Sequence, residues 1–185
     1  MTKIIGLIAG SLRKASFSKK IAHAVAGMAP AGFTFRIIAL DDLPVYNQDF
    51  DDHNEVPPSY TAFRGAIGAL DGFIFITPEH NRSVPAALKN ALDIGSRPYG
   101  SNVWSGKAAA VFSNSPGNLG GFGANHHLRQ CLVCLGVPTM QQPEVYLAQV
   151  AACFDESGAM KEGKSKEFLQ KAVDAYIAWF SKNRA

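Results

Sequence analysis

The residues with the clearest chemical potential follow the first apolar run of the chain, in the stretch GSLRKASFS at 10–18. Ser11, Ser16, Ser18 and Arg13 are crowded here between an expected strand and an expected helix, without any acid. A helix N-terminus presents free backbone N–H groups and a partial positive charge, which bind anions. Serine hydroxyls and an arginine fork add donors. The stretch predicts a site for a terminal phosphate monoester; the alternative is a serine N-cap beside a solvated arginine.

Other phosphate motifs do not fit this chain. The pattern G-x-x-x-x-G-K-[ST] is absent, which argues against an ATP or GTP site. The dinucleotide pattern G-x-G-x-x-G does not follow the first apolar run either. Asp41 and Asp42 come close to the end of the second expected strand, but an acid there indicates a dinucleotide site only together with those glycines.

A second candidate loop, PEHNRS at 78–83, follows an expected buried strand. Pro85 suits the first turn of the helix that follows it. The loop could offer its backbone and the carboxamide of Asn81 to a planar heterocycle, and the alternative is a capped helix entry. Glu79 has no visible acid–base partner, so we expect it to bond backbone amides or a neighbouring chain.

A third candidate loop lies in SNSPGNLGGFGAN at 113–125, which holds four glycines. Glycine permits close approach of the backbone to a ligand, and the alternative is a mobile surface loop. His126 and His127 follow, but adjacent residues on a helix point in different directions. We therefore expect no metal site there.

Composition and charge bound the class of protein. The 185 residues are 47% apolar and 18% charged, as in ordinary globular domains. A net charge of +3 without a Lys/Arg block gives no support for nucleic-acid binding. No segment approaches the ~20 apolar residues of a membrane span, and the N-terminus lacks the pattern of a signal peptide. We expect a cytoplasmic protein with no membrane partner.

The three cysteines do not suggest a disulfide framework. Cys131 and Cys134 match C-x-x-C, but they lie inside the expected helix HHLRQCLVCLG. A redox pair is expected at a helix start, and zinc would need two further ligands. We expect both thiols to face the core on one side of that helix.

Apolar runs alternate with amphipathic stretches along the whole chain. Strands are expected at 3–9, 33–38, 72–77, 107–112 and near 144–149. Helices are expected at 16–28, 59–70, 84–96, 121–135 and 165–181, with a long loop at 41–60. Continuously apolar strands alternating with helices predict an α/β fold with a parallel sheet covered on both faces. Ligands of such sheets bind beyond the carboxyl ends of the strands, where the three candidate loops lie.

Taken together, GSLRKASFS, PEHNRSVPAALKNALD and SPGNLGG resemble the NAD(P)H-dependent FMN reductases of the flavodoxin-like fold. The likeness is to the bacterial quinone and chromate reductases, and it covers nearly the whole chain. It implies one FMN-binding domain over residues 1–185, built as a three-layer sandwich with strand order 2-1-3-4-5. It also implies a homodimer or homotetramer.

The resemblance assigns cofactor contacts to each loop. The first loop would bind the FMN phosphate through Ser11, Leu12, Arg13, Ser16, Phe17 and Ser18. The second would line the ring and ribityl chain through Pro78, Glu79, His80, Asn81 and Arg82. The third would approach the ring through Ser115 and Gly117.

Two positions depart from the family pattern. His80 stands where Tyr is usual, and Ile94-Gly95 stands where Trp commonly follows the aspartate. Both departures are expected near the flavin or a subunit interface, where they would affect acceptor preference and assembly.

The activity implied is transfer of a hydride from NADH or NADPH to FMN, followed in a ping-pong sequence by reduction of a small-molecule acceptor. Acceptors would be quinones, free flavin, azo compounds or metal oxyanions such as chromate. No side-chain nucleophile is required, and backbone amides at 115–118 and 79–82 would stabilise charge on the reduced ring. The alternative is a flavodoxin-like electron carrier, although such carriers are typically acidic.

Overall fold

The computed structural model describes residues 1–183, which form a five-stranded parallel sheet and its covering helices. The strands are β1 (Lys3–Ala9), β2 (Phe33–Ile38), β3 (Gly72–Pro78), β4 (Ala108–Asn114) and β5 (Val145–Leu147). The helices are α1 (Phe17–Ala26), α2 (Asp49–Asp52), α3 (Pro58–Gly68), α4 (Ala86–Gly95), α5 (Phe122–Cys134), α6 (Lys164–Asn183) and the 3-10 turn η1 (Val150–Cys153). The order β2-β1-β3-β4-β5 confirms the predicted flavodoxin-like sandwich.

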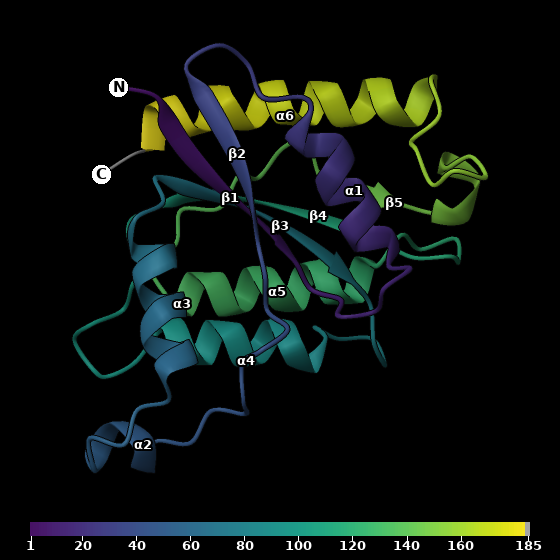
Figure 1. Cartoon of the computed structure of the whole chain (residues 1–185). Coiled ribbons are helices and arrows are strands. Elements are labelled where there is room, and N and C mark those ends of the chain that lie inside the picture. Colours follow the sequence, from purple (N-terminus) through teal and green to yellow (C-terminus); the bar gives the residue numbers. More distant parts are fainter. Residues whose placement is uncertain (184–185) are drawn as a thin grey trace.

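The sheet is buried on both faces because helices cover each of them. Helices α1 and α6 lie on one face, and α3, α4 and α5 lie on the other (Figure 1). Successive side chains of a strand point to opposite faces. In β3, Ile74 and Ile76 therefore enter the core under α1 and α6, whereas Phe73 and Phe75 enter the opposite core.

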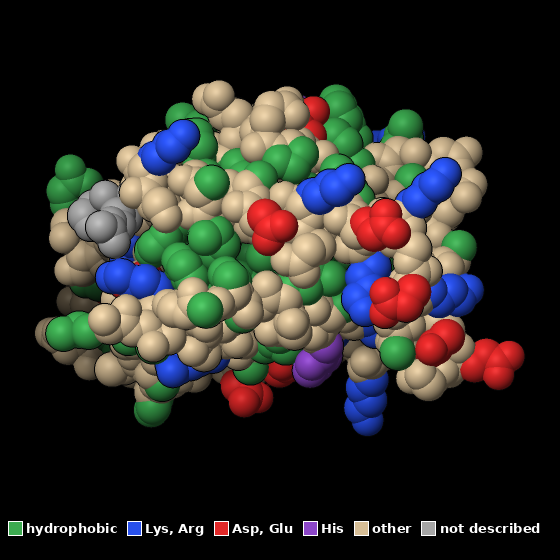
Figure 2. All heavy atoms as spheres, turned by 90° about the horizontal axis from the view of Figure 1, so that it is seen from above, with side chains coloured by type: hydrophobic (Ala, Val, Ile, Leu, Met, Phe, Trp, Pro, Cys, Tyr) green, Lys and Arg blue, Asp and Glu red, His purple; other side chains and the backbone are tan. Residues whose placement is uncertain are grey.

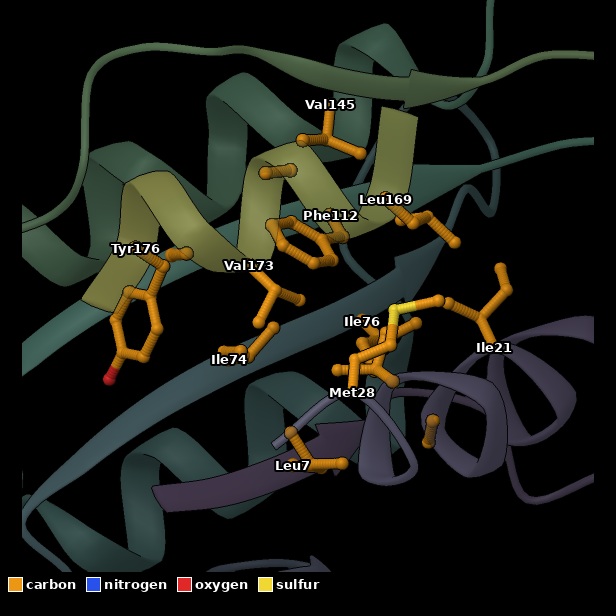
Figure 3. Close-up of a cluster of buried hydrophobic side chains, with 14 of the residues drawn as sticks. Leu7, Ile21, Met28, Ile74, Ile76, Phe112, Val145, Leu169, Val173 and Tyr176 are labelled. Atoms are coloured by element: carbon orange, nitrogen blue, oxygen red, sulfur yellow. The ribbon is translucent and has the colours of Figure 1, made fainter. Parts of the chain in front are cut away.

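Figure 3 shows the first of these cores, where side chains of α6, the sheet and α1 meet. Val173 of α6 lies beside Phe112 of β4 and Ile74 of β3, and all three are fully buried. Such apolar burial on both sides explains why the central strands are continuously apolar in sequence.

The segment 41–60, predicted as a loop, contains helical residues that its composition did not indicate. Helix α2 lies inside it, and α3 begins at Pro58. The Arg64 guanidinium makes two 2.8 Å hydrogen bonds to the Asp51 carboxylate, and both side chains are nearly buried. The hydrogen bond from Arg64 is the largest of the effects on the pKa of Asp51, and it holds this pKa below its ordinary value. This pair anchors the long loop to α3.

Ile94 and Gly95 do not lie in the pocket at the candidate loops. Both residues are fully buried at the end of α4, and α4 starts beyond the carboxyl end of β3 and runs back toward the opposite edge of the sheet. A side chain at Gly95 would collide with the indole of Trp104, whose Nε1 donates to the Leu92 carbonyl oxygen at 3.1 Å. Trp104, which follows α4 in the sequence, fills this space, and it does not line the pocket at the candidate loops.

Figure 2 views the molecule from the side of α6, the face opposite to α3, α4 and α5. Basic and acidic side chains are interspersed on this face and do not gather into one basic patch. In the described part of the chain, none of the helices has the length and apolar character that crossing a membrane requires.

Candidate functional site

The three predicted loops meet at one edge of the sheet because β1, β3 and β4 all end there. The sheet order reverses between β1 and β3, since β2 lies on the other side of β1. The Gly10 amide donates to the Ile76 carbonyl oxygen at 2.9 Å, which ties the first loop to β3. This is the switch point at which open parallel sheets bind ligands.

A pocket of about 190 Å³ lies between these loops. Nine of the predicted residues line it: Ser11, Arg13, Ser16, Phe17, Ser18, Pro78, Glu79, His80 and Ser115. Leu12, Asn81, Arg82 and Gly117 belong to the same loops but not to its lining. Asn114 and Pro116 also line it, and the sequence analysis missed both.

The first loop leads directly into the N-terminus of α1. Ser16 is the N-cap, and its hydroxyl oxygen accepts from the Lys19 amide at 3.3 Å. Ser16 and Ser18 are both buried, and the first turn of α1 carries no acid. The positive end of the helix thus faces the pocket, an arrangement that suits the binding of an anion.

Arg13 is exposed, and its guanidinium donates a hydrogen bond of 3.1 Å to the Ala15 carbonyl oxygen. No carboxylate within residues 1–183 lies at ion-pair distance from it. Lys19, in contrast, is engaged with Asp41 and with the Leu12 carbonyl oxygen, each at 3.2 Å. Lys19 therefore holds the loop in place, and Arg13 keeps its charge free for an anion.

Asn114 joins the first loop to the central strands. Its Nδ2 donates to the Ser18 hydroxyl oxygen at 3.0 Å and to the Thr77 carbonyl oxygen at 3.2 Å. Because Ser18 accepts this bond, its own proton remains free for another acceptor. Asn114 is 2% exposed, so it fixes Ser18 at the pocket wall. A polar residue at the end of an apolar strand was the signal that could have found it.

The second loop is a tight hairpin. His80 and Ser83 exchange backbone hydrogen bonds of 3.1 and 2.9 Å. Asn81 and Arg82 between them have φ values of +49° and +65°, as in a type I′ turn. The turn directs both side chains to solvent, which explains why neither lines the pocket.

Glu79 has the structural role that was predicted for it. Its Oε2 accepts from the Ala124 amide at 3.1 Å, at the N-terminus of α5. Glycine is required at position 123, because a Cβ there would lie 2.7 Å from the Arg82 carbonyl oxygen. Glu79 therefore fastens the second loop to the start of α5 while it also lines the pocket.

The glycines of the third loop serve packing more than ligand approach. A Cβ on Gly120, which has a φ of +57°, would lie 2.7 Å from the Tyr146 backbone. One on Gly121, with a φ of +79°, would lie 3.0 Å from Ser113. Gly117 is exposed and has open space around it. The prediction that this loop's glycines admit a ligand is therefore wrong for Gly120 and Gly121.

The third loop is also held firmly by the segment after β5. The Ser115 amide donates to the Leu147 carbonyl oxygen at 3.0 Å, and Val150 and Gln149 donate back to Ser115 and Gly117. Of the backbone amides expected at 115–118 to face a ligand, that of Ser115 is already paired. In residues 1–183 the Gly117 amide has no such backbone partner.

The two histidines of α5 have separate partners, as their adjacent positions predicted. His126 Nε2 lies 2.9 Å from the Tyr146 hydroxyl, and His127 Nδ1 lies 3.0 Å from the Ser83 hydroxyl. Burial, followed by Glu144, raises the pKa of Tyr146 to about 12. Across the described residues, His, Cys, Asp and Glu side chains form no group of three that could hold a metal ion.

The pocket fits the phosphate end of a flavin mononucleotide. Buried Ser16 and Ser18, the α1 N-terminus and the unpaired Arg13 supply donors on one side, and the lining contains a single acid, Glu79. That acid is occupied by the α5 amide. The sheet order and the position of the pocket are those of flavodoxin-like proteins, which bind a nucleotide phosphate at the switch point of the sheet.

Comparison with known proteins narrows this class to one family. Residues 2–152 match the family described as NADPH-dependent FMN reductase. The chain belongs to this family and is an FMN-dependent NAD(P)H oxidoreductase.

Relatives in sequence and structure agree with this assignment. A quinone reductase of Pseudomonas putida is 49% identical over 98% of this chain and 96% of its own length. A 2-hydroxy-1,4-benzoquinone reductase of Burkholderia sp is 40% identical over 97% of both chains. FerB, a flavoenzyme NAD(P)H:(acceptor) oxidoreductase of Paracoccus denitrificans, superposes with a TM-score of 0.90 at 36% identity over 100% of both chains.

Proposed function

We propose that the chain is a quinone reductase that draws electrons from NADH or NADPH, with residues 1–185 acting as one FMN-binding domain. The observation that carries the proposal is the unpaired Arg13 beside the α1 N-terminus, at the pocket where the three loops meet. The names of the Pseudomonas putida and Burkholderia relatives support a quinone as the acceptor.

The phosphate of FMN would be held by the first loop. Arg13 supplies the charge, Ser11, Ser16 and Ser18 supply hydroxyl groups, and Phe17 and Leu12 flank them. Charge-assisted hydrogen bonds of this kind contribute roughly 1.5–3 kcal/mol each. Ser18 is oriented for this role by Asn114.

The second and third loops would hold the remainder of the cofactor. Pro78, Glu79 and His80 form one wall, with Asn81 and Arg82 on the turn above, and Ser115 and Gly117 face them. Bound FMN supplies the redox chemistry, because its ring takes a hydride from the nicotinamide and gives electrons to the acceptor. The free Gly117 amide is suited to donate to a negatively charged ring edge.

The pocket size favours an accessible ring. At about 190 Å³ it is smaller than the roughly 300 Å³ of sites that enclose a drug-sized ligand. It suits the phosphate and the ribityl chain, and a ring system would stay at the open side. Donor and acceptor would then use the same opening in turn, which supports ping-pong kinetics. Free flavin, azo compounds and chromate remain further acceptors to assay.

We propose a homodimer or homotetramer in the cytoplasm. Leu12, Leu119 and Phe122 are exposed apolar side chains on and beside the first and third loops, which supports an interface near the site. Light scattering of the purified protein gives the number of subunits, and cell fractionation tests the location.

The test begins with the flavin released by denaturing the purified protein. We expect FMN, identified by chromatography, and quinone-dependent oxidation of NADH or NADPH with parallel double-reciprocal lines. The nicotinamide alone should bleach the flavin absorption band before any acceptor is added. Release of FAD contradicts the proposal, and so does a protein that takes no electrons from either nicotinamide, which is the behaviour of a simple electron carrier.

A further inference from the structure

The C-x-x-C pair of α5 lies in a surface groove that the reductase function does not use. Cys131 is half-buried and Cys134 is exposed, so the prediction that both thiols face the core was wrong. The groove has a volume of about 390 Å³. It is lined by Ser83, Val84, Lys89, His127, Gln130, Cys131 and Cys134. The pocket assigned to FMN shares none of these residues.

Helix geometry explains why the two thiols share this groove. The buried face of α5 is centred on Leu128 and Leu132. Cys131 packs partly against this core, Cys134 is exposed, and both line the groove beside Lys89 of α4. Residues at i and i+3 on a helix have Cβ atoms roughly 5–6 Å apart. Two sulfur ligands at this spacing on a rigid helix can therefore reach one ion between them.

The groove that holds the pair also contains a cation, Lys89, which is paired with a carboxylate of its own helix. The Lys89 Nζ is 2.7 Å from the Asp93 carboxylate.

The number of ligands selects the class of ion. A structural zinc site needs four ligands, whereas the described residues include no group of three potential metal-holding side chains. His127 lines the groove, yet its Nδ1 is engaged with the Ser83 hydroxyl. Soft thiolates without other ligands favour Cu(I), which accepts two-coordinate binding.

We propose that Cys131 and Cys134 form a two-coordinate site for a soft monovalent cation of the Cu(I) type. Each thiol gives up its proton as its sulfur binds the ion, so one Cu(I) displaces two protons and no electron is transferred. The resulting site of one Cu(I) and two thiolates carries a net charge of −1.

The experiment is a competition for Cu(I) under anaerobic conditions, using FMN-loaded, fully reduced protein and the coloured Cu(I)–bicinchoninate complex as the probe. Wild-type protein should withdraw one Cu(I) per chain with release of two protons. Cys131→Ser and Cys134→Ser should each weaken binding by about 100-fold or more, beyond the 10–100-fold that loss of an outer-shell partner costs. Cys153→Ser is the matched control, since Cys153 is half-buried elsewhere and contacts Ser165.

Flavin content and quinone-dependent NAD(P)H oxidation should stay unchanged in Cys131→Ser and Cys134→Ser, because the groove and the pocket share no residue. X-ray absorption of the Cu(I) form should show two sulfur neighbours. Stoichiometric withdrawal by a Cys131→Ser/Cys134→Ser double variant overturns the proposal. So does a wild-type protein that withdraws no Cu(I), or one that holds Zn²⁺ through these cysteines against a chelator.

Discussion

The first and third loops leave the same edge of the sheet, and both combine serine with glycine, but their polar groups have different fates. In the first loop, Arg13 donates one hydrogen bond to the Ala15 carbonyl oxygen, and within residues 1–183 it has no ion-pair partner. The Ser18 hydroxyl oxygen accepts from Asn114, which leaves its proton available. In the third loop, Ser115 donates its amide to Leu147, and its carbonyl oxygen accepts from Val150. One loop keeps its donors for a ligand, and the other uses them to bind the scaffold.

The difference arises from the segment that each loop contacts. The first loop runs into the N-terminus of α1, where amides have no intrahelical acceptor. The third loop lies against β5 and the turn at Gln149, whose backbone groups accept and donate along its length. The composition of a loop therefore does not reveal whether its polar groups are available to a ligand. The segment against which the loop packs determines which of these groups are already paired.

The largest expected effect tests the supporting role of the third loop. Gly120→Ala places a side chain at a φ of +57° and 2.7 Å from the Tyr146 backbone. We expect the free energy of unfolding to fall by about 2–4 kcal/mol, and the Tm by roughly 5–15 °C. Thermal unfolding followed by circular dichroism measures this change.

Gly117→Ala is the matched control, because Gly117 lies in the same loop with open space where a Cβ would stand. Its Tm should stay within about 2 °C of the wild type, as for other surface substitutions. Equal decreases of Tm in the two variants would show that an added side chain destabilises this loop wherever it stands. The contrast between the first and third loops would then be lost.

The next effect tests the binding role of the first loop. Arg13→Ala removes a charge-assisted contact of roughly 1.5–3 kcal/mol, so FMN should bind about 10- to 100-fold more weakly. The Tm of the apoprotein should not change, since Arg13 is exposed. Titration of apoprotein with FMN, followed by flavin fluorescence, gives the Kd.

Lys14→Ala provides the comparison for Arg13→Ala. Lys14 is an exposed cation next in sequence that does not line the pocket. It should change FMN affinity by less than about threefold, as a surface charge screened by water does. If both variants lose affinity equally, the first loop attracts the cofactor by its net charge and not through the position of Arg13.

A smaller effect tests the residue that links the two loops. Asn114→Ala removes two buried donated bonds, to Ser18 and Thr77. We expect a loss of about 1–3 kcal/mol in stability and, because Ser18 is no longer fixed, a further decrease of about 3- to 10-fold in FMN affinity. Chemical denaturation and FMN titration measure the two changes.

Asn125→Ala is the matched control for Asn114. Asn125 is equally buried, and its Nδ2 donates to Ser113, Val111 and Val145, outside the pocket lining. It should lower stability and leave the FMN affinity of the folded protein intact. Loss of affinity in both variants would mean that stability alone, not the position of Ser18, determines binding.

The sequence predicted the fold well because its signals were local. Every strand was found within two residues of its observed bounds, since the runs at 73–76 and 108–112 are apolar without interruption. The short helix α2 was missed, because Asp49–Asp52 lacks an apolar face and depends on the ion pair between Asp51 and Arg64. That pair joins residues thirteen apart in sequence, and no periodicity reveals it.

The site was predicted in outline, and its errors arose where a residue contacts a segment outside the candidate loops. Ser16 and Glu79 act through neighbours along the chain or at a helix start, and both roles were recognised. The role of Gly120 depends on Tyr146, and the burial of Gly95 depends on Trp104. Spatial pairing of this kind carries no signature in one sequence, so the glycines were assigned to a ligand or to an interface.

The smallest expected effect on cofactor affinity comes from His80, where the two binding loops meet the opening. Its backbone is fixed by the hairpin with Ser83, so His80→Tyr changes only an exposed side chain. FMN affinity should change by less than about threefold. The ring of Tyr is larger and carries its hydroxyl further out, so it should alter the fit of acceptors at the shared opening. The ratio of kcat/KM for a small and a bulky quinone should shift by about 3- to 10-fold, the range that one added or lost apolar contact produces.

His53→Tyr is the matched control, because His53 is exposed at the end of α2 and does not line the pocket. It should change neither the FMN affinity nor the ratio of kcat/KM. A changed Kd with an unchanged ratio would place His80 with the cofactor-holding residues of the first loop and remove it from acceptor selection.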